Sequence, residues 1–311
     1  MVDLSRGTTG AADLLPREIS TEIWADAQEQ SAVMQLATPV RVPGTGLTIP
    51  IITGDAAADW VAETAAKPVS RATLGKKVMT PYKLAVIETF SDEFRRDLPG
   101  VYAELRRRLP GAIAKKFDQT VFGTTAPGSG FDTLGGATAV PIGPHATDVK
   151  KNTYSGLVKA YTDIAAAGGT LDGWALSSQA KGLLLGQVDS TGRPLLYNDI
   201  QAGSPVGSLL GERVYYTQGV HAAGTPATIG FAGDWSSTFY GTVEGIKVDI
   251  SNQASIVDGT TTVGTGEHAV NIPNVINLWQ QNMFAVLVEV EIGFIARDVA
   301  RFRKITNGTI S

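Results

Sequence analysis

The sequence predicts an α+β protein in which a long helix and separate β-strands accompany an extended surface arm. Three patterns support this prediction. Residues 101–122 have the apolar spacing of one long helix, and residues 286–295 alternate between apolar and polar positions as a strand does. Residues 54–81 form a mostly polar stretch, without a tight-turn dipeptide, between two strand-like runs. This stretch is therefore expected to be a long arm and not a simple hairpin turn.

The bulk composition excludes several classes of protein. The 311 residues suffice for two domains or one large domain, and 43% hydrophobic residues with a net charge of -4 are typical of a water-soluble chain. Such a charge argues against a dedicated DNA-binding protein. The chain has no cysteine, so disulfides, thiolate chemistry and cysteine-based metal sites are excluded. No long apolar run or signal-peptide pattern occurs, so we expect a cytosolic protein with no membrane partner.

The N-terminal third is expected to begin with a flexible arm over residues 1–15. A helix follows over residues 16–37, with Pro16 as its first residue and one apolar face formed by Ile19, Ile23, Ala27 and Met34. Residues 39–53 then read as strand, interrupted at Pro43 and Gly44. Residues 79–90 form a second strand run, which is predicted to pair with the first.

The long helix is preceded by a shorter predicted one. Ser91, followed by two acidic residues, has the pattern of a helix start, and Pro99-Gly100 ends that short helix. The long helix then carries apolar residues at every fourth position: Val101, Leu105, Leu109, Ile113, Phe117 and Val121. This spacing drifts about 40° per step around an α-helix, so the stripe winds and needs partners on more than one side. Pro110 requires a kink or compensating packing.

The second half reads as a mixed α/β unit after a Gly/Pro-rich connection, with a boundary near residue 150. Thr153 is expected to cap a helix that ends at Gly168-Gly169. A short strand at 174–178 and a short helix at 179–188 follow. Further strands are expected at 212–217, 227–232 and 246–251, before the alternating strand near the C-terminus.

The sequence offers no convincing catalytic, cofactor or metal site. His145, His221 and His268 lie in loop-like segments without metal-ligand spacing. Residues 123–130 are glycine-rich but lack the Lys-Ser/Thr pair of a phosphate-binding loop, so they are interpreted as a linker. No G-x-S-x-G motif occurs, and a triad of His221, Asp234 and Ser236 has no support beyond residue type. We therefore expect a protein that is not an enzyme.

Two groups of residues have ordinary structural explanations. The cations at residues 106–108, 115–116 and near the C-terminus (Arg297, Arg301, Arg303, Lys304) are expected to form solvated faces or ion pairs between subunits. Trp24, Trp174, Trp235 and Trp279 are expected to be core anchors. Trp60 differs, because its neighbours in sequence offer almost nothing to bury it against.

The arm that carries Trp60 points to assembly. Ordering each of its residues costs about 1–2 kcal/mol of backbone entropy, and its few apolar side chains cannot offset that cost within one chain. Either the segment is a disordered loop, or another subunit stabilises it. We predict the second, and propose as interface residues Trp60, Glu63, Lys67, Arg71, Lys76 and Lys77.

Several blocks, in this order, resemble the major capsid proteins of tailed bacteriophages with the Hong Kong 97-type fold. "IPIITGD", "WVAE", "KPVS" and "YKLAVIETFSDEF" are similar to the extended loop of that family, and "LRRRLPGAIAKKFDQTVFG" to its long spine helix. "FAGDWSS" is similar to a Gly-Asp-aromatic-Ser turn, and "WQQNMFAVLVEVEIGFIARDVARFRKIT" to the closing strands. The order and spacing of the blocks along nearly the whole chain carry the resemblance.

The resemblance implies a domain organisation: an N-terminal arm with a short helix (1–46), the extended β-hairpin loop (47–90), a peripheral domain with the spine helix (91–150), an axial domain (151–245) and return strands of the peripheral domain (246–311). It implies self-assembly into the hexamers and pentamers of an icosahedral head that encloses double-stranded DNA without sequence-specific binding. Expected partners are a portal and a separate scaffolding or decoration protein. The expected location is the virion capsid, assembled in the host cytoplasm.

Lysine-asparagine cross-links occur in some members, and Lys67, Lys76 and Lys77 lie in the matching region, but we expect non-covalent contacts here. The alternatives are an encapsulin-type cargo compartment, a tail-tube subunit and, from another class, an enzyme with glycine-rich loops or a carbohydrate-binding module. Neighbouring genes would separate a phage head from a cargo compartment, whereas rings or tubes would indicate a tail-tube subunit and monomers in solution would favour the other class.

Overall fold

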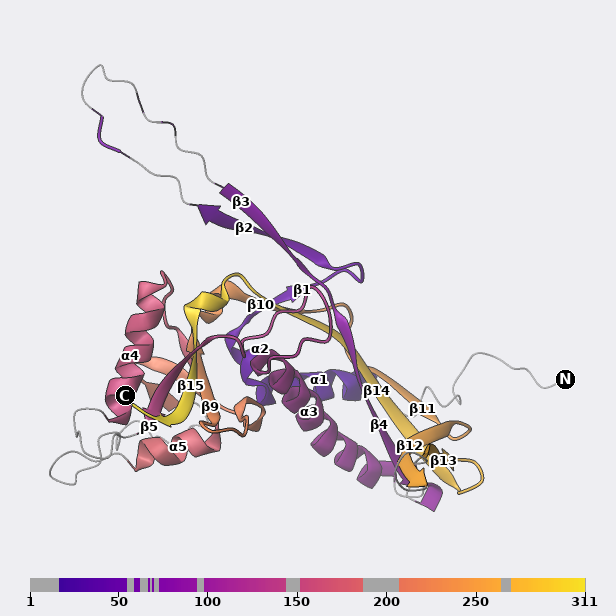
Figure 1. Cartoon of the computed structure of the whole chain (residues 1–311). Helices are drawn as coiled ribbons and strands as arrows, with labels where there is room; N and C mark the ends of the chain where they lie inside the picture. Colours follow the sequence, from indigo (N-terminus) through magenta and orange to yellow (C-terminus); the bar gives the residue numbers. More distant parts are fainter. Residues whose placement is uncertain are drawn as a thin grey trace. The chain divides into compact units, whose positions relative to one another are not determined.

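The computed structural model describes residues 17–54, 59–61, 67, 69, 73–93, 98–143, 152–186, 207–263 and 270–310. The chain divides into two compact units (Figure 1). Unit 1 contains residues 1–30, 83–114 and 244–291, and unit 2 contains residues 31–82, 115–243 and 292–311. The long helix α3 (Leu98–Phe122) and the long strand β14 (Met283–Ala296) each contribute to both units.

Unit 1 packs two helical segments against strands that pair with β14. Its elements are α1 (Arg17–Gln30), most of β4 (Tyr82–Ser91), the first half of α3, β11 (Lys247–Ser251), β12 (Ser255–Val263), β13 (Val270–Asn277) and the first half of β14. Strand β11 is antiparallel to β14, and β4 pairs with β14 as well. Ile23 of α1 and Leu109 of α3 are buried with alternate residues of β14, which confirms the strand pattern predicted near the C-terminus.

Two predicted helices differ from the structure at this end of the chain. The helix expected over residues 16–37 is two helices, because the side chain of Ser31 accepts a hydrogen bond from the Met34 backbone and starts α2 (Ala32–Leu36). The short helix expected from Ser91 is not formed at its start, since Ser91 ends β4 and only a 3-10 turn follows over residues 92–93. Helix α3 begins at Leu98 and contains Pro99 and Gly100 in its first turn.

Unit 2 is built on a six-stranded mixed sheet with the order β5-β15-β9-β6-β8-β7. Its strands are β5 (Thr138–Gly143), β15 (Phe302–Thr309), β9 (Thr228–Gly233), β6 (Gly173–Leu176), β8 (Glu212–Tyr216) and β7 (Gly207–Leu209). The pairs β5–β15 and β6–β8 are parallel, and the others are antiparallel. Strands β8 and β9 confirm the short strands predicted at 212–217 and 227–232.

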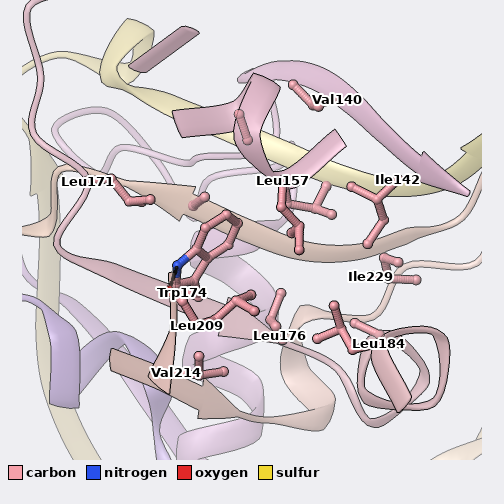
Figure 2. Packing of buried hydrophobic residues seen from close by; sticks show 14 of the residues in the cluster. Val140, Ile142, Leu157, Leu171, Trp174, Leu176, Leu184, Leu209, Val214 and Ile229 are labelled. Carbon is pink, nitrogen blue, oxygen red and sulfur yellow. Dashed lines mark hydrogen bonds between the residues drawn. The ribbon is translucent and has the colours of Figure 1, made fainter. Parts of the chain in front are cut away.

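The main core of unit 2 lies between this sheet and the helices α4 (Thr153–Ala166) and α5 (Ser178–Leu185) (Figure 2). Leu157 of α4, Leu184 of α5 and Trp174 of β6 are all buried there. The prediction that Thr153 caps α4 was wrong, because Thr153 is the first residue of the helix. Asn152 is the cap, and it exchanges hydrogen bonds with Ser155 in a capping box.

The winding stripe of α3 is confirmed where its side chains are described. Leu109 and Ile113 belong to the core of unit 1, while Phe117 and Val121 are buried in unit 2. Phe117 packs edge to face against Phe131, with ring centroids 6.4 Å apart. Helix α3 runs through Pro110 as one element, so the stripe meets different partners along its length.

The arm is a paired ribbon of β2 (Leu47–Gly54) and β3 (Thr73–Met79) (Figure 1). The predicted pairing of the first strand run with the second was therefore wrong in part. Strand β3 lies within the polar stretch itself, whereas β4 from the second run pairs with β14. The sequence "TLGKKVM" contains a glycine and two lysines, which are uncommon in strands, so its residue types did not predict a strand.

Candidate assembly surfaces

The base of the arm is anchored in unit 2 by a small hydrophobic cluster. Ile49 of β2 and Met79 of β3 are buried with Val42 and Ile295, next to β1 (Thr38–Arg41) and β10 (Thr238–Thr242). The chain enters β2 through Gly46, whose φ of 94° and close approach to the Met79 carbonyl exclude a side chain. The root of the arm is thus held by packing and by a glycine turn.

Lys77 adds a polar attachment at the same root. Its ammonium group donates to Asp132 Oδ2 at 2.9 Å and to the Ala296 carbonyl at 2.7 Å. The same Asp132 oxygen accepts the Ala296 backbone N–H at 3.1 Å. Lys77 is therefore engaged within its own chain, which separates it from the other predicted interface residues. Asp132 was not identified from the sequence, because its partner lies far away in the chain.

A loop of the same unit supports the arm from the side of β3. The Thr80 backbone N–H donates to the Gly130 carbonyl at 2.8 Å, and the Tyr82 hydroxyl donates to the Ser129 carbonyl at 2.7 Å. Gly130 has a φ of 79°, and a side chain there would collide with Thr80. The glycines at 123–130 thus allow the loop to pack closely against the root of the arm, where the sequence predicted a linker.

The far part of the arm is exposed wherever it is described. Trp60 is fully exposed and Val69 is 85% exposed, and Lys67 and Lys76 are exposed as well. Glu63 and Arg71 lie outside the described residues. Trp60 contrasts with the usual burial of large aromatic side chains, so the described far part of the arm exposes a large apolar side chain to solvent.

A buried carboxylate of α3 in unit 2 binds both the start of α2 and the residue that follows β8. Asp118 of α3 is fully buried and accepts hydrogen bonds from the Ser31 hydroxyl at 2.6 Å and the Thr217 hydroxyl at 3.0 Å. It also accepts the backbone N–H groups of Ala32 at 3.1 Å and Val33 at 3.4 Å, at the start of α2. Asp118 lies in the sequence block that resembles the spine helix of the capsid family, but no role was predicted for it.

Burial raises the pKa of Asp118 to about 6, although its four hydrogen bonds favour the charged form and act in the opposite direction. The cost of burying a carboxylate is large unless donors surround it, as they do here. Asp118 is therefore a structural acceptor that joins three segments, and its environment is closed to solvent and substrate.

The described tryptophans fall into two groups. Trp174 and Trp235 are fully buried, and Trp24 is half-buried against the core of unit 1, as predicted. The prediction for Trp279 was wrong, because it is 74% exposed in the turn between β13 and β14. That turn connects β13 to β14, which belong to different sheets, so its side chains need not face the core.

The C-terminal cations also differ from their prediction, since they have partners within unit 2. Arg301 pairs with Asp234 at 3.2 Å, and Arg303 donates to the Asp163 carbonyl at 2.7 Å. Lys304 donates to the Gly135 carbonyl, and Arg297 lies over the Phe239 ring. These residues fix β15 and its neighbours and do not form a free basic surface.

The geometry gives no catalytic arrangement among the candidate residues that are described. The Ser236 hydroxyl donates to Asp234 at 2.6 Å, while His221 Nδ1 contacts the Thr228 carbonyl at 3.2 Å. These contacts do not join His221 to Ser236 and Asp234, so the triad that residue type alone allowed is not formed. His145 and His268 lie outside the described residues. Within the described ranges, no group of acidic, histidine or cysteine side chains could hold a metal ion, and no helix is long and apolar enough to cross a membrane.

The fold and its surfaces define a structural subunit, with an anchored arm that exposes its far residues and no assembled catalytic group in the described part. Comparison with known proteins gives the family: the phage capsid family model matches residues 11–306. The chain belongs to this family. A "Probable major capsid protein gp17" of Mycobacterium phage D29 is 31% identical over 97% of this chain and 92% of its own length. The corresponding protein of Mycobacterium phage L5 is 29% identical over 94% and 89%.

Solved structures show the same fold at lower sequence identity. A chain from Mycobacterium phage Bobi has a TM-score of 0.67 and 21% identity, covering 98% of this chain and 99% of that one. A chain from Gordonia phage Cozz has a TM-score of 0.64 and 23% identity, covering 98% of both. The family and the curated relatives are structural capsid proteins, so the predictions of a shell subunit of the virion and of a non-enzymatic role are confirmed.

Proposed function

We propose that this subunit forms the hexamers and pentamers of an icosahedral phage head with the Hong Kong 97-type arrangement of domains. We assign residues 151–245 to an axial domain, and the segments 91–150 and 246–311 to a peripheral domain. The head would enclose double-stranded DNA without reading its sequence, and would assemble in the host cytoplasm. A portal and a separate scaffolding or decoration protein complete the proposed set of partners.

One observation carries the proposal: the arm is fixed at its root and exposed beyond it. Ile49, Met79 and Lys77 hold the root within unit 2, whereas Trp60 is fully exposed and Val69 is 85% exposed. An ordered projecting arm loses backbone entropy that its own contacts do not repay. A neighbouring subunit that covers Trp60 supplies the missing burial, worth a few kcal/mol for one large aromatic side chain.

Electron microscopy of the purified protein tests the proposed assembly. Closed polyhedral shells with five-fold vertices are expected. Tubes or stacked rings would contradict the icosahedral head and favour a tail-tube subunit, and a protein that stays monomeric under all assembly conditions would contradict self-assembly. Denaturing electrophoresis of the shells should give a single band at 32.7 kDa, since the proposed contacts are non-covalent.

A shortened arm tests its role. Strand β2 ends at Gly54, and strand β3 begins at Thr73. Residues 55–72 can therefore be replaced by Asn-Gly, which favours a tight hairpin turn. The root, with Met79 and Lys77, is retained. We expect a folded, soluble subunit that forms no stable shells. A matched variant that replaces the same residues with an equally long Gly/Ser segment should fail too, because it keeps the length but removes Trp60. Shells at the wild-type yield from either variant would contradict the role of the arm.

A further inference from the structure

A short segment of unit 2 covers the buried carboxylate of Asp118 on one side. The segment consists of residues 217–221 and contains the 3-10 helix η3 (Gln218–Val220). Its residue Thr217, which binds Asp118, is only half-buried, whereas residues 31–34 on the α2 side of the carboxylate are all buried. The shorter path between Asp118 and water therefore leads through the segment 217–221.

Two hydroxyl groups are directed at the carboxylate by backbone donors. Thr217 Oγ1 accepts the Gly219 N–H at 3.2 Å and donates to Asp118 Oδ2 at 3.0 Å. Ser31 Oγ accepts the Met34 N–H at 3.2 Å and donates to Asp118 Oδ1 at 2.6 Å. Since a backbone N–H occupies each hydroxyl oxygen, the hydroxyl proton is available to the carboxylate. The Thr217 hydroxyl thus joins the segment to α3 through Asp118.

The segment lies directly on α3 but buries little apolar surface there. A Cβ atom at Gly219 would lie 2.5 Å from Asp118 Cβ and 3.2 Å from the Lys115 carbonyl oxygen, which is closer than ordinary contact. Val220 is the one buried apolar side chain of residues 217–221, whereas α2 buries four. Opening the segment therefore exposes less apolar surface than opening α2, and local openings favour such weakly packed segments.

Burial opposes the charge of Asp118 while the segment is closed. It raises the pKa of this carboxyl from 3.8 to about 6, against the effect of its four hydrogen bonds. In the described part of the chain no charged side chain contributes: the Lys115 side chain is exposed, and His221 Nδ1 contacts the Thr228 carbonyl. Hydration returns the pKa toward its ordinary value. The closed form is therefore favoured most below pH 3.8 and loses this advantage as the pH rises to about 6.

We infer that residues 217–221 form a gate over Asp118, which opens locally when the carboxylate is ionised and stays closed when it is neutral. Opening breaks the hydrogen bond between Thr217 and Asp118 and lets water solvate the carboxylate. The six-stranded sheet stays folded during this opening. The inference concerns the single subunit and does not depend on the proposed assembly.

Hydrogen exchange followed by mass spectrometry tests the gate on the full-length subunit before assembly. The protection factor, which is the ratio of intrinsic to measured exchange rate, is compared between residues 217–221 and β6, whose four residues are all buried. We expect protection at the gate to be at least about tenfold lower than in β6 at pH 7. It should also fall roughly fiftyfold from pH 4 to pH 7, because ionisation favours the open form.

Two results of this measurement would overturn the inference. Equal protection at residues 217–221 and in β6 would show that Asp118 is hydrated only when the whole unit unfolds. A protection factor at the gate that stays constant or rises from pH 4 to pH 7 would show that ionisation does not open it.

Two variants assign the pH dependence to one group. Asp118→Asn cannot ionise, so protection at residues 217–221 should no longer fall between pH 4 and pH 7. His221→Gln should keep the fall, although histidine side chains change charge in this pH range. A fall that persists in Asp118→Asn or disappears in His221→Gln would overturn the inference. The wild-type protein and His221→Gln decide the question if Asp118→Asn does not fold.

Gly219→Ala tests the geometry of the gate without changing a charge. Its added Cβ atom would collide with α3, so protection at residues 217–221 should already be low at pH 4 and should change little up to pH 7. Gly182→Ala in α5 is the matched control, because nothing lies within 4 Å of a Cβ atom added there, and it should behave as the wild type. Wild-type protection at the gate of Gly219→Ala would contradict the closed arrangement.

Discussion

The buried tryptophans Trp174 and Trp235 and the tryptophan of the arm show two uses of the same residue type in unit 2. Trp174 and Trp235 are fully buried, and their indole N–H groups donate to the Leu209 carbonyl at 3.1 Å and the Gly173 carbonyl at 3.0 Å. Trp60 is fully exposed. The core thus buries its large aromatic side chains within one chain, whereas the large aromatic side chain of the arm is left exposed to solvent. We therefore expect the residues that stabilise the fold to differ from the residues that serve assembly.

The largest expected effect on stability comes from the sheet. Trp174→Ala removes a fully buried indole and leaves the Leu209 carbonyl without its donor, so it should cost about 3–5 kcal/mol in the free energy of unfolding. Urea denaturation followed by circular dichroism measures this loss. A loss below about 1 kcal/mol would show that the stability of the sheet does not depend on Trp174. It would contradict the distinction between a stabilising buried tryptophan and the exposed tryptophan of the arm.

Asp118 should give the next effect, and it should depend on pH. Its pKa in the folded protein is about 6 against an ordinary value of 3.8, so the folded state holds the proton between these values while the unfolded state has lost it. The contribution of this group to stability is therefore greatest below pH 3.8 and is lost as the pH rises to about 6, a change of about 3 kcal/mol.

The variant Asp118→Asn isolates that contribution, because other titrating groups affect both proteins equally. The wild-type advantage over Asp118→Asn in unfolding free energy should be larger at pH 4 than at pH 7. At both pH values the variant should be the less stable protein, since an amide replaces an acceptor that faces four donors. An advantage that grows from pH 4 to pH 7 would contradict the raised pKa.

A smaller effect is expected at the root of the arm. The ion pair of Lys77 and Asp132 is about one-third exposed on each side, so a double-mutant cycle with alanine should give a coupling energy of less than about 1 kcal/mol. Shell yield should nevertheless fall for Lys77→Ala, because the pair positions β3. Lys83→Ala, which breaks an ion pair with Glu289 outside the arm, should leave the yield nearly unchanged. Equal yields for the two variants would contradict the positioning role.

The sequence predicted much of the fold, because apolar spacing reflects burial. The stripe from Leu109 to Val121, the alternation near Val286 and the turn after α4 all agree with the structure. The pairing of β3 was missed, since its two lysines and glycine weaken the strand pattern and the pairing depends on Met79 and Lys77 at its root. The exposure of Trp279 was missed because residue type alone does not tell whether a turn faces the core.

The candidate site could be predicted only in part. Trp60 was identified because its neighbours in sequence lack apolar residues, and the described structure agrees that it is exposed. Lys77 was grouped with the exposed lysines, although it binds Asp132 and the Ala296 carbonyl. Its role depends on contacts between segments distant in the sequence, and neither spacing nor composition reports such contacts. The same reason explains why Asp118 carried no predicted role.

The variant Trp60→Ala tests the claim that the arm serves assembly and not the fold of its own chain. Unfolding free energy and shell yield are measured on the same preparation, with Val69→Ala as a second exposed position of the arm. We expect a change in unfolding free energy within about 0.5 kcal/mol together with a clear loss of shells for Trp60→Ala. An equal loss of both quantities, or a full yield of shells, would contradict the claim.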